Sequence, residues 1–96
     1  MSYTVRTIYT KPNVDVSLHT PPTEYTNQIN SFFDAGKIIQ KPTESIDGLT
    51  HIYTMIFDNE TSFNEFKSTS ASISNYTMRN NHCDSNSISY SIEQDI

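Results

Sequence analysis

Three side chains that could take part in catalysis or ligand binding lie on segments whose side chains alternate between two faces, as in β-strands. His51 and Tyr53 alternate in "LTHIYTMIF", and Tyr9 lies near the end of "YTVRTIYT". An imidazole facing a ligand cavity could accept a proton or orient a carbonyl or carboxylate group. Tyrosine hydroxyls around an apolar volume could fix the orientation of a bound molecule. The residues that we expect to contact a ligand are His51, Tyr53, Tyr9, Arg6, Tyr90 and Met55.

Each of these residues also has a plainer interpretation. His51 could hydrogen-bond across the sheet or to a partner chain. The tyrosines could belong to an ordinary core or to a dimer interface. Arg6 could bind a ligand carboxylate or form an ion pair at that interface. The face of the sheet on which each side chain lies decides between these interpretations.

The sequence His82-Cys83-Asp84 resembles a metal cluster only at first sight. Adjacent residues rarely ligate one ion, and no second ligand group stands at a spacing that would complete the usual four zinc ligands. Cys83 as a nucleophile would need an activating base, and His82 points elsewhere in an extended chain. We therefore expect no metal and no cofactor, a polar loop here, and a His19 that is exposed or caps a helix.

Composition excludes several partners and favours another copy of the chain. The net charge is −5, and the six Lys and Arg are scattered, which argues against nucleic acid and against anionic membrane surfaces. One cysteine, no apolar leader in "MSYTVRTIYT" and no apolar run long enough to span a bilayer lead us to expect a cytoplasmic protein. The hydrophobic fraction of 34% is low, so a small domain of this kind is expected to gain burial as a homo-oligomer.

Periodicity predicts one domain over residues 1–96, with alternating strands and helices. The first helix carries the stripe Tyr25, Ile29, Phe32 and Phe33 and ends at Gly36. Asp47-Gly48 is expected to form a type I′ hairpin turn. Asp58-Asn59 is expected to cap the second helix, which we expect to be a single helix. The predicted strands are 3–10, 37–46 (weakened by Pro42), 49–57 and 87–93, with an extended segment over 14–18 and a polar loop from residue 79 to the last strand.

This order predicts an α+β fold of the βαββαβ type: a four-stranded antiparallel sheet with two helices on one face. The strand 49–57 is apolar on both faces, since Ile52 and Ile56 alternate with Tyr53, Met55 and Phe57. Either set could lie under the helices. The other set would then need cover from a second copy packed sheet to sheet.

On "TVRTIYTKPNVDV", "DGLTHIYTMIF" and "DNETSFNEF", the chain resembles the dimeric α/β-barrel proteins. This ferredoxin-like group includes antibiotic-biosynthesis monooxygenases and small uncharacterised bacterial and marine proteins. The resemblance implies a homodimer whose interior holds a small, mostly apolar ligand. It carries over no catalytic motif, and no residue set matches the haem-degrading members. RNA-recognition domains and acylphosphatases share the topology, but the third strand has no Lys, Arg or Gly, and "TKPNVD" has no glycine to cradle phosphate.

We expect this protein to bind a small hydrophobic molecule, fatty-acid-like or aromatic, in an apolar cavity. The alternative is a cofactor-free monooxygenase or isomerase that uses His51 as its base. A third possibility is a structural or regulatory dimer with a filled core. The first two require a cavity, and the third requires none.

Overall fold

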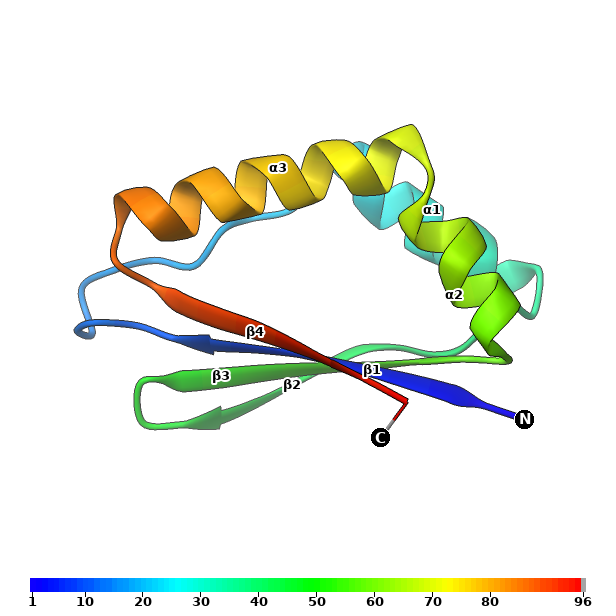
Figure 1. The fold of residues 1–96 in the computed structure, drawn as a ribbon, viewed down its shortest axis with the longest axis horizontal. Helices are drawn as coiled ribbons and strands as arrows, with labels where there is room; N and C mark the ends of the chain where they lie inside the picture. The colour runs from blue at the N-terminus through cyan, green and yellow to red at the C-terminus, as the bar shows by residue number, and fades with distance from the viewer. Residues whose placement is uncertain (96) are drawn as a thin grey trace.

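The computed structural model describes residues 1–95 as one antiparallel sheet with helices on one face. Figure 1 shows the helices on one side of the sheet and nothing on the other. The strand order β2-β3-β1-β4 is compatible with a ferredoxin-like fold. The strands are β1 (Tyr3–Thr10), β2 (Ile38–Asp47), β3 (Thr50–Phe57) and β4 (Ser89–Gln94); the helices are α1 (Thr23–Asp34), α2 (Glu60–Lys67) and α3 (Ser70–Ser85).

Strand register settles which side chains face the helices. Val5 pairs with Met55, and both are buried in the core, so the odd-numbered residues of β1 and β3 lie under the helices. Their even-numbered neighbours form the open face, where Ile8 pairs with Ile52. Of the two arrangements left open by the sequence, the structure therefore has the larger side chains of β3 inside.

The best-packed part of the core lies where α1 and α2 meet the sheet. Phe66 is fully buried, and its ring lies 5.2 to 5.5 Å from those of Phe32, Phe57 and Tyr25 in edge-on contacts. Phe63 extends this group through Phe57, at 5.3 Å. We call Phe32, Phe57, Phe63 and Phe66 the aromatic core. Such rings bury large apolar areas in favourable edge-to-face geometry.

Several predicted boundaries agree with the structure. Asn59 caps α2, since its side chain accepts a hydrogen bond from the Ser62 amide at 2.9 Å. Gly36 takes the left-handed conformation after α1, with φ of 77°. Strand β2 is an edge strand, and its pairing with β3 is irregular around Pro42, as expected for a residue without an amide proton. Phe33 departs from the expected stripe, because its ring is 41% exposed and lies under the Lys41 ammonium.

The β2–β3 turn is shifted by one residue from the prediction. Asp47 pairs with Thr50, so Gly48 and Leu49 are the central residues. Gly48 has φ of 61°, whereas neither Asp47 nor Leu49 has a positive φ. A positive φ at the first central residue alone is typical of a type II′ turn, not type I′. Leu49 therefore belongs to the turn and not to the strand.

Two predictions about the second half of the chain were wrong. The expected single second helix is broken at Ser68, and a new helix starts at Ser70 after the N-cap Thr69, whose hydroxyl accepts from the Ser72 amide at 3.2 Å. The residues expected to form a polar loop instead continue this helix, α3, as far as Ser85. Strand β4 consequently starts at Ser89 and not at 87, after a Ser87 with φ of 57°.

Candidate functional site: a cavity between the sheet and α3

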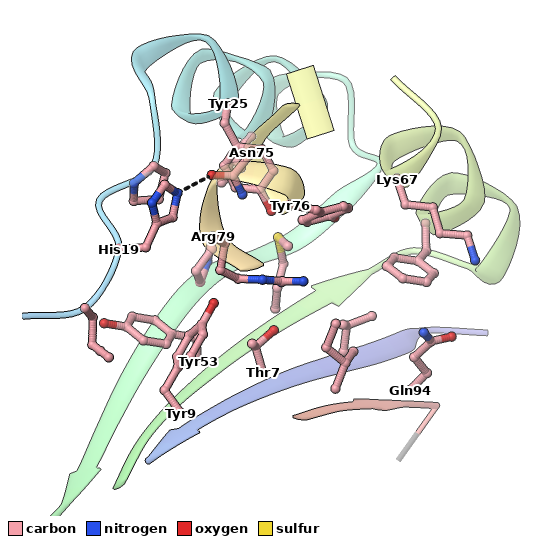
Figure 2. Close-up of a pocket in the computed structure, with 18 residues that line it drawn as sticks. Thr7, Tyr9, His19, Tyr25, Tyr53, Lys67, Asn75, Tyr76, Arg79 and Gln94 are labelled. Atoms are coloured by element: carbon pink, nitrogen blue, oxygen red, sulfur yellow. Dashed lines mark hydrogen bonds between the residues drawn. The ribbon is translucent and has the colours of Figure 1, made fainter. Parts of the chain in front are cut away.

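A cavity of about 290 Å³ lies between the sheet and the helices. Its floor comes from β1, β3 and β4, and its roof from α1, α2 and α3, with a side wall from the segment that leads into α1. Figure 2 shows Lys67 and Gln94 at one end, His19, Tyr9 and Tyr53 at the other, and Arg79 and Thr7 between them. Most of the lining is apolar, and the residues that line it are Val5, Thr7, Tyr9, Leu18, His19, Pro21, Tyr25, Ile29, Pro42, Tyr53, Met55, Phe63, Lys67, Asn75, Tyr76, Arg79, Ile92 and Gln94.

Helix α3 presents polar side chains to this interior. Its buried residues are Ser72, Asn75, Arg79 and Cys83, spaced three or four apart and therefore on one face of the helix. Most helices bury an apolar stripe and expose a polar one. The buried stripe of α3 instead contains Ser72, Asn75 and Arg79, which places hydrogen-bonding groups above the sheet, as a pocket needs if it is to orient a ligand.

Arg79 is the most unusual member of this stripe. Its residue is 6% exposed, and Nε donates a hydrogen bond to Asn80 Oδ1 at 3.1 Å. The guanidinium carbon lies 4.9 Å from the Tyr76 ring centre and 5.5 Å from that of Tyr90. Within residues 1–95, no carboxylate pairs with Arg79, and the guanidinium also interacts with the Tyr9 phenol, whose pKa, raised by burial, it partly lowers. Figure 2 shows the side chain reaching from α3 into the space above the sheet.

Tyr9 and Tyr53 lie below Arg79, with ring centres 5.8 Å apart in an edge-on contact. Burial raises the pKa of the Tyr9 phenol, and the nearby Arg79 guanidinium partly opposes that rise. Burial, and then the hydrogen bond to Glu44, raises the pKa of Tyr53. Both phenols therefore keep their protons at neutral pH. The Tyr53 hydroxyl donates to Glu44 Oε2, so the Tyr9 hydroxyl is the freer of the two donors.

His19 forms part of the cavity wall through a contact with α3. One of its ring nitrogens, Nε2, lies 2.9 Å from Asn75 Oδ1, and this bond is drawn in Figure 2. His82 Nε2 donates to the Ser17 carbonyl at 2.7 Å and holds the same segment nearby. These two bonds hold the segment before α1 against α3. They close one end of the cavity, and they give His19 a place in the wall instead of the exposed or capping role expected of it.

The structure brings together three of the six residues expected to contact a ligand. Tyr9, Tyr53 and Met55 line the cavity. Tyr90 pairs with Tyr9 on the neighbouring strand and stacks against Arg79, outside the lining. Arg6 lies on the open face, where it forms an exposed ion pair with Glu93 at 3.3 Å.

His51 lies next to the cavity without lining it. Its Nδ1 is 3.1 Å from Glu44 Oε2, the same oxygen that accepts the Tyr53 hydroxyl proton. The hydrogen bonds from Tyr53 and then from His51 lower the pKa of the Glu44 carboxyl. Glu44 therefore stays ionised and holds both side chains at the β2–β3 hairpin. This is the cross-sheet hydrogen bond that we gave as the plainer interpretation of His51.

Sequence reasoning did not single out several residues that line the cavity, above all Arg79, Asn75, Tyr76 and Lys67. The spacing of the buried residues of α3 was a usable signal in the sequence. These residues, Ser72, Asn75, Arg79 and Cys83, recur at helical intervals. That pattern is invisible to a search for apolar periodicity, which is how a buried helix face is normally found.

No metal site is found among residues 1–95, where no group of three His, Cys, Asp or Glu side chains is close enough to hold an ion. Cys83 is fully buried, and burial raises the pKa of its thiol, which disfavours the reactive thiolate. In the same part of the chain, no helix combines the length and apolar character needed to cross a membrane.

Comparison with protein-family models, with curated proteins and with solved structures gives no match for this chain.

Proposed function

We propose that this protein binds a small, mostly apolar molecule in the cavity beneath α3. The observation that carries the proposal is a partly open cavity of about 290 Å³ in a chain of only 96 residues. Protein interiors are close-packed, and voids larger than a water molecule are few. At ~30 Å³ for a water-sized group, this cavity has room for roughly ten such groups. It therefore suits a short fatty-acid-like chain or a small aromatic compound.

The lining supports binding more directly than catalysis. Polar groups on Arg79, Tyr9 and Asn75 converge on an apolar space, as in sites that fix the orientation of a ligand. His51, the base of the enzymatic alternative, is held by Glu44 outside the lining. Tyr9 and Tyr53, the two tyrosines at that end of the cavity, keep their protons at neutral pH. We therefore propose binding without a reaction.

We further propose that two copies pair through their open faces, as in a dimeric α/β barrel. On β1, β3 and β4 this face carries Ile8, Ile52 and Ile56 among threonines and serines. Its only charged residues there, Arg6 and Glu93, neutralise each other. A chain of net charge −5 repels its copy least where its surface is neutral. Sedimentation of an Ile52→Glu variant tests this: the wild type should sediment as a dimer and the variant as a monomer, whereas a monomeric wild type contradicts the pairing.

Native mass spectrometry of the protein purified from cells, compared with its denatured mass, tests the binding proposal. We expect an adduct of small-molecule mass that disappears on denaturation. Thr7→Leu places extra volume in the cavity floor and should abolish the adduct. Thr54→Leu makes the same chemical change on the open face and should retain it. An adduct that survives Thr7→Leu, or a wild type that takes up no apolar molecule when one is supplied in excess, would overturn the proposal.

A further inference from the structure

We propose that the cavity selects an anionic ligand, and that Arg79 binds its negatively charged group, a carboxylate attached to a short apolar body. This inference rests on the binding function proposed above and adds the chemical class of the ligand. It follows from three observations on the cavity: the sign of its charges, the absence of a carboxylate partner for Arg79 in the described residues, and the apolar side chains that line the cavity between Arg79 and Lys67.

The charge of the lining is opposite to the charge of the chain. The sequence has 11 Asp and Glu against 6 Lys and Arg, yet the lining holds Lys67 and Arg79 and no carboxylate. Glu44 contacts the lining residue Tyr53, and its carboxylate accepts hydrogen bonds from Tyr53 and His51. A cavity with two cations and no acid favours an anion over a cation or a neutral molecule.

Arg79 lacks the partner that a buried guanidinium needs. A guanidinium has five N–H donors, and Arg79 uses one of them on Asn80. Buried charges are normally paired, because removing an ion from water is costly. The only side-chain atom sealed from solvent without a partner in residues 1–95 is Asp58 Oδ1, so neither terminal nitrogen of Arg79, a residue of the cavity lining, is both sealed and unpaired. A carboxylate could accept two parallel hydrogen bonds from such a guanidinium.

The contacts of Arg79 orient it without neutralising it. Tyr76 and Tyr90 lie within 5.5 Å of the guanidinium carbon, and aromatic faces attract a cation but carry no net charge. The side chain is therefore held in place before a ligand arrives, which lowers the entropy lost on binding.

The apolar part of a ligand has its own place in the cavity. Tyr9, next to Arg79, marks the polar end of the floor. Between Tyr9 and the end marked by Lys67 and Gln94 (Figure 2), Val5 pairs with Met55, and both line the cavity together with Phe63. A ligand with its carboxylate at Arg79 would lay its chain along these side chains.

Titration with octanoate, 1-octanol and octylammonium, followed by amide and Arg79 Nε–H NMR signals, tests this inference. The three probes share one chain and differ in charge. We expect octanoate to bind the wild type about ten- to a hundred-fold more tightly than 1-octanol, the range for a hydrogen bond to a charged group. Octylammonium should bind weakest. Arg79→Gln should remove the preference for octanoate, whereas Arg6→Gln, which makes the same change on the open face, should keep it.

Each other outcome has a definite meaning. Equal binding of octanoate and 1-octanol in the cavity would overturn the choice of an anion and leave the binding function standing. A preference that survives Arg79→Gln but is lost in Lys67→Gln would overturn the role of Arg79. Absence of binding by all three probes at millimolar concentration would overturn both proposals. If Arg79→Gln does not fold, the order of the three probes in the wild type and a partial loss in Arg79→Lys decide the matter.

Discussion

The space between the sheet and the helices is filled at one end and open at the other. Under α1 and α2 the aromatic core packs ring against ring, and Phe57 and Phe66 are fully buried. Under α3 the same layer contains the cavity, and the buried side chains of α3 include the polar Ser72, Asn75 and Arg79. Two parts of one interior therefore follow opposite rules. The first is filled by packed rings, and the second leaves a cavity of about 290 Å³.

The largest expected effect comes from the filled end. Phe66→Ala should lower the free energy of unfolding by about 3–5 kcal/mol, since a buried ring is replaced by a void among packed neighbours. Ile92→Ala, in the cavity wall, should cost only about 1 kcal/mol, because Ile92 is 43% exposed. Urea unfolding of the two variants measures the contrast. Equal losses would mean that the two ends do not differ as described.

A change of opposite sign is expected at the open end. Arg79→Met should raise the free energy of unfolding of the ligand-free protein by about 1 kcal/mol, because it removes an unpaired buried charge and keeps most of the side-chain volume. Arg6→Met changes the net charge by the same amount but breaks only an exposed ion pair. It should therefore lower the free energy of unfolding by about 0–1 kcal/mol. A clear loss of stability in Arg79→Met would assign Arg79 a structural role.

The hairpin that borders the cavity should depend on pH. The pKa of Glu44 is lowered from its ordinary value of 4.5, chiefly by the Tyr53 hydroxyl and then by His51. Its contribution to stability is therefore present above pH 4.5 and is lost as pH falls through the lower folded value. The wild type should be more stable than Glu44→Gln at pH 7, and the difference should vanish near pH 3. Urea unfolding at both pH values checks this, and a difference that does not change with pH would contradict it.

The smallest expected effect concerns the thiol on α3. Cys83 is fully buried, and burial raises its pKa, so it should react with a thiol reagent at pH 8 only when the chain unfolds. The reaction rate in the folded protein, compared with that in urea, measures the protection. Rapid modification of the folded protein would show that α3 opens readily and that the cavity roof is loose.

The sequence predicted the filled end better than the open one. Phe32 lies at helical spacing in the first predicted helix, and Phe57 lies on an alternating strand, so standard periodicity found both the elements and the packed rings. The hairpin turn was misplaced by one residue, because Asp47-Gly48 and Gly48-Leu49 both satisfy the preference for glycine at positive φ.

The open end was harder to predict for a physical reason. Helix α3 buries Asn75 and Arg79, so its pattern resembles that of a solvent-exposed loop. Tyr9, Tyr53 and Met55 were expected near a ligand because their strands could be recognised, and they line the cavity. Arg6 and His51 were also on recognisable strands. Arg6 lies on the open face, and His51 is held by Glu44 outside the cavity lining. The alternation of residues along a strand reveals neither which face is covered nor which side chain Glu44 contacts.

Isotope-filtered NOE measurement on labelled protein with unlabelled octanoate tests the central claim most directly. The account predicts contacts from the methylene next to the carboxylate to Arg79 and Tyr9, and from the terminal methyl group to Met55 and Phe63. Contacts to Ile8 and Ile52 on the open face, with none to Arg79, would contradict it.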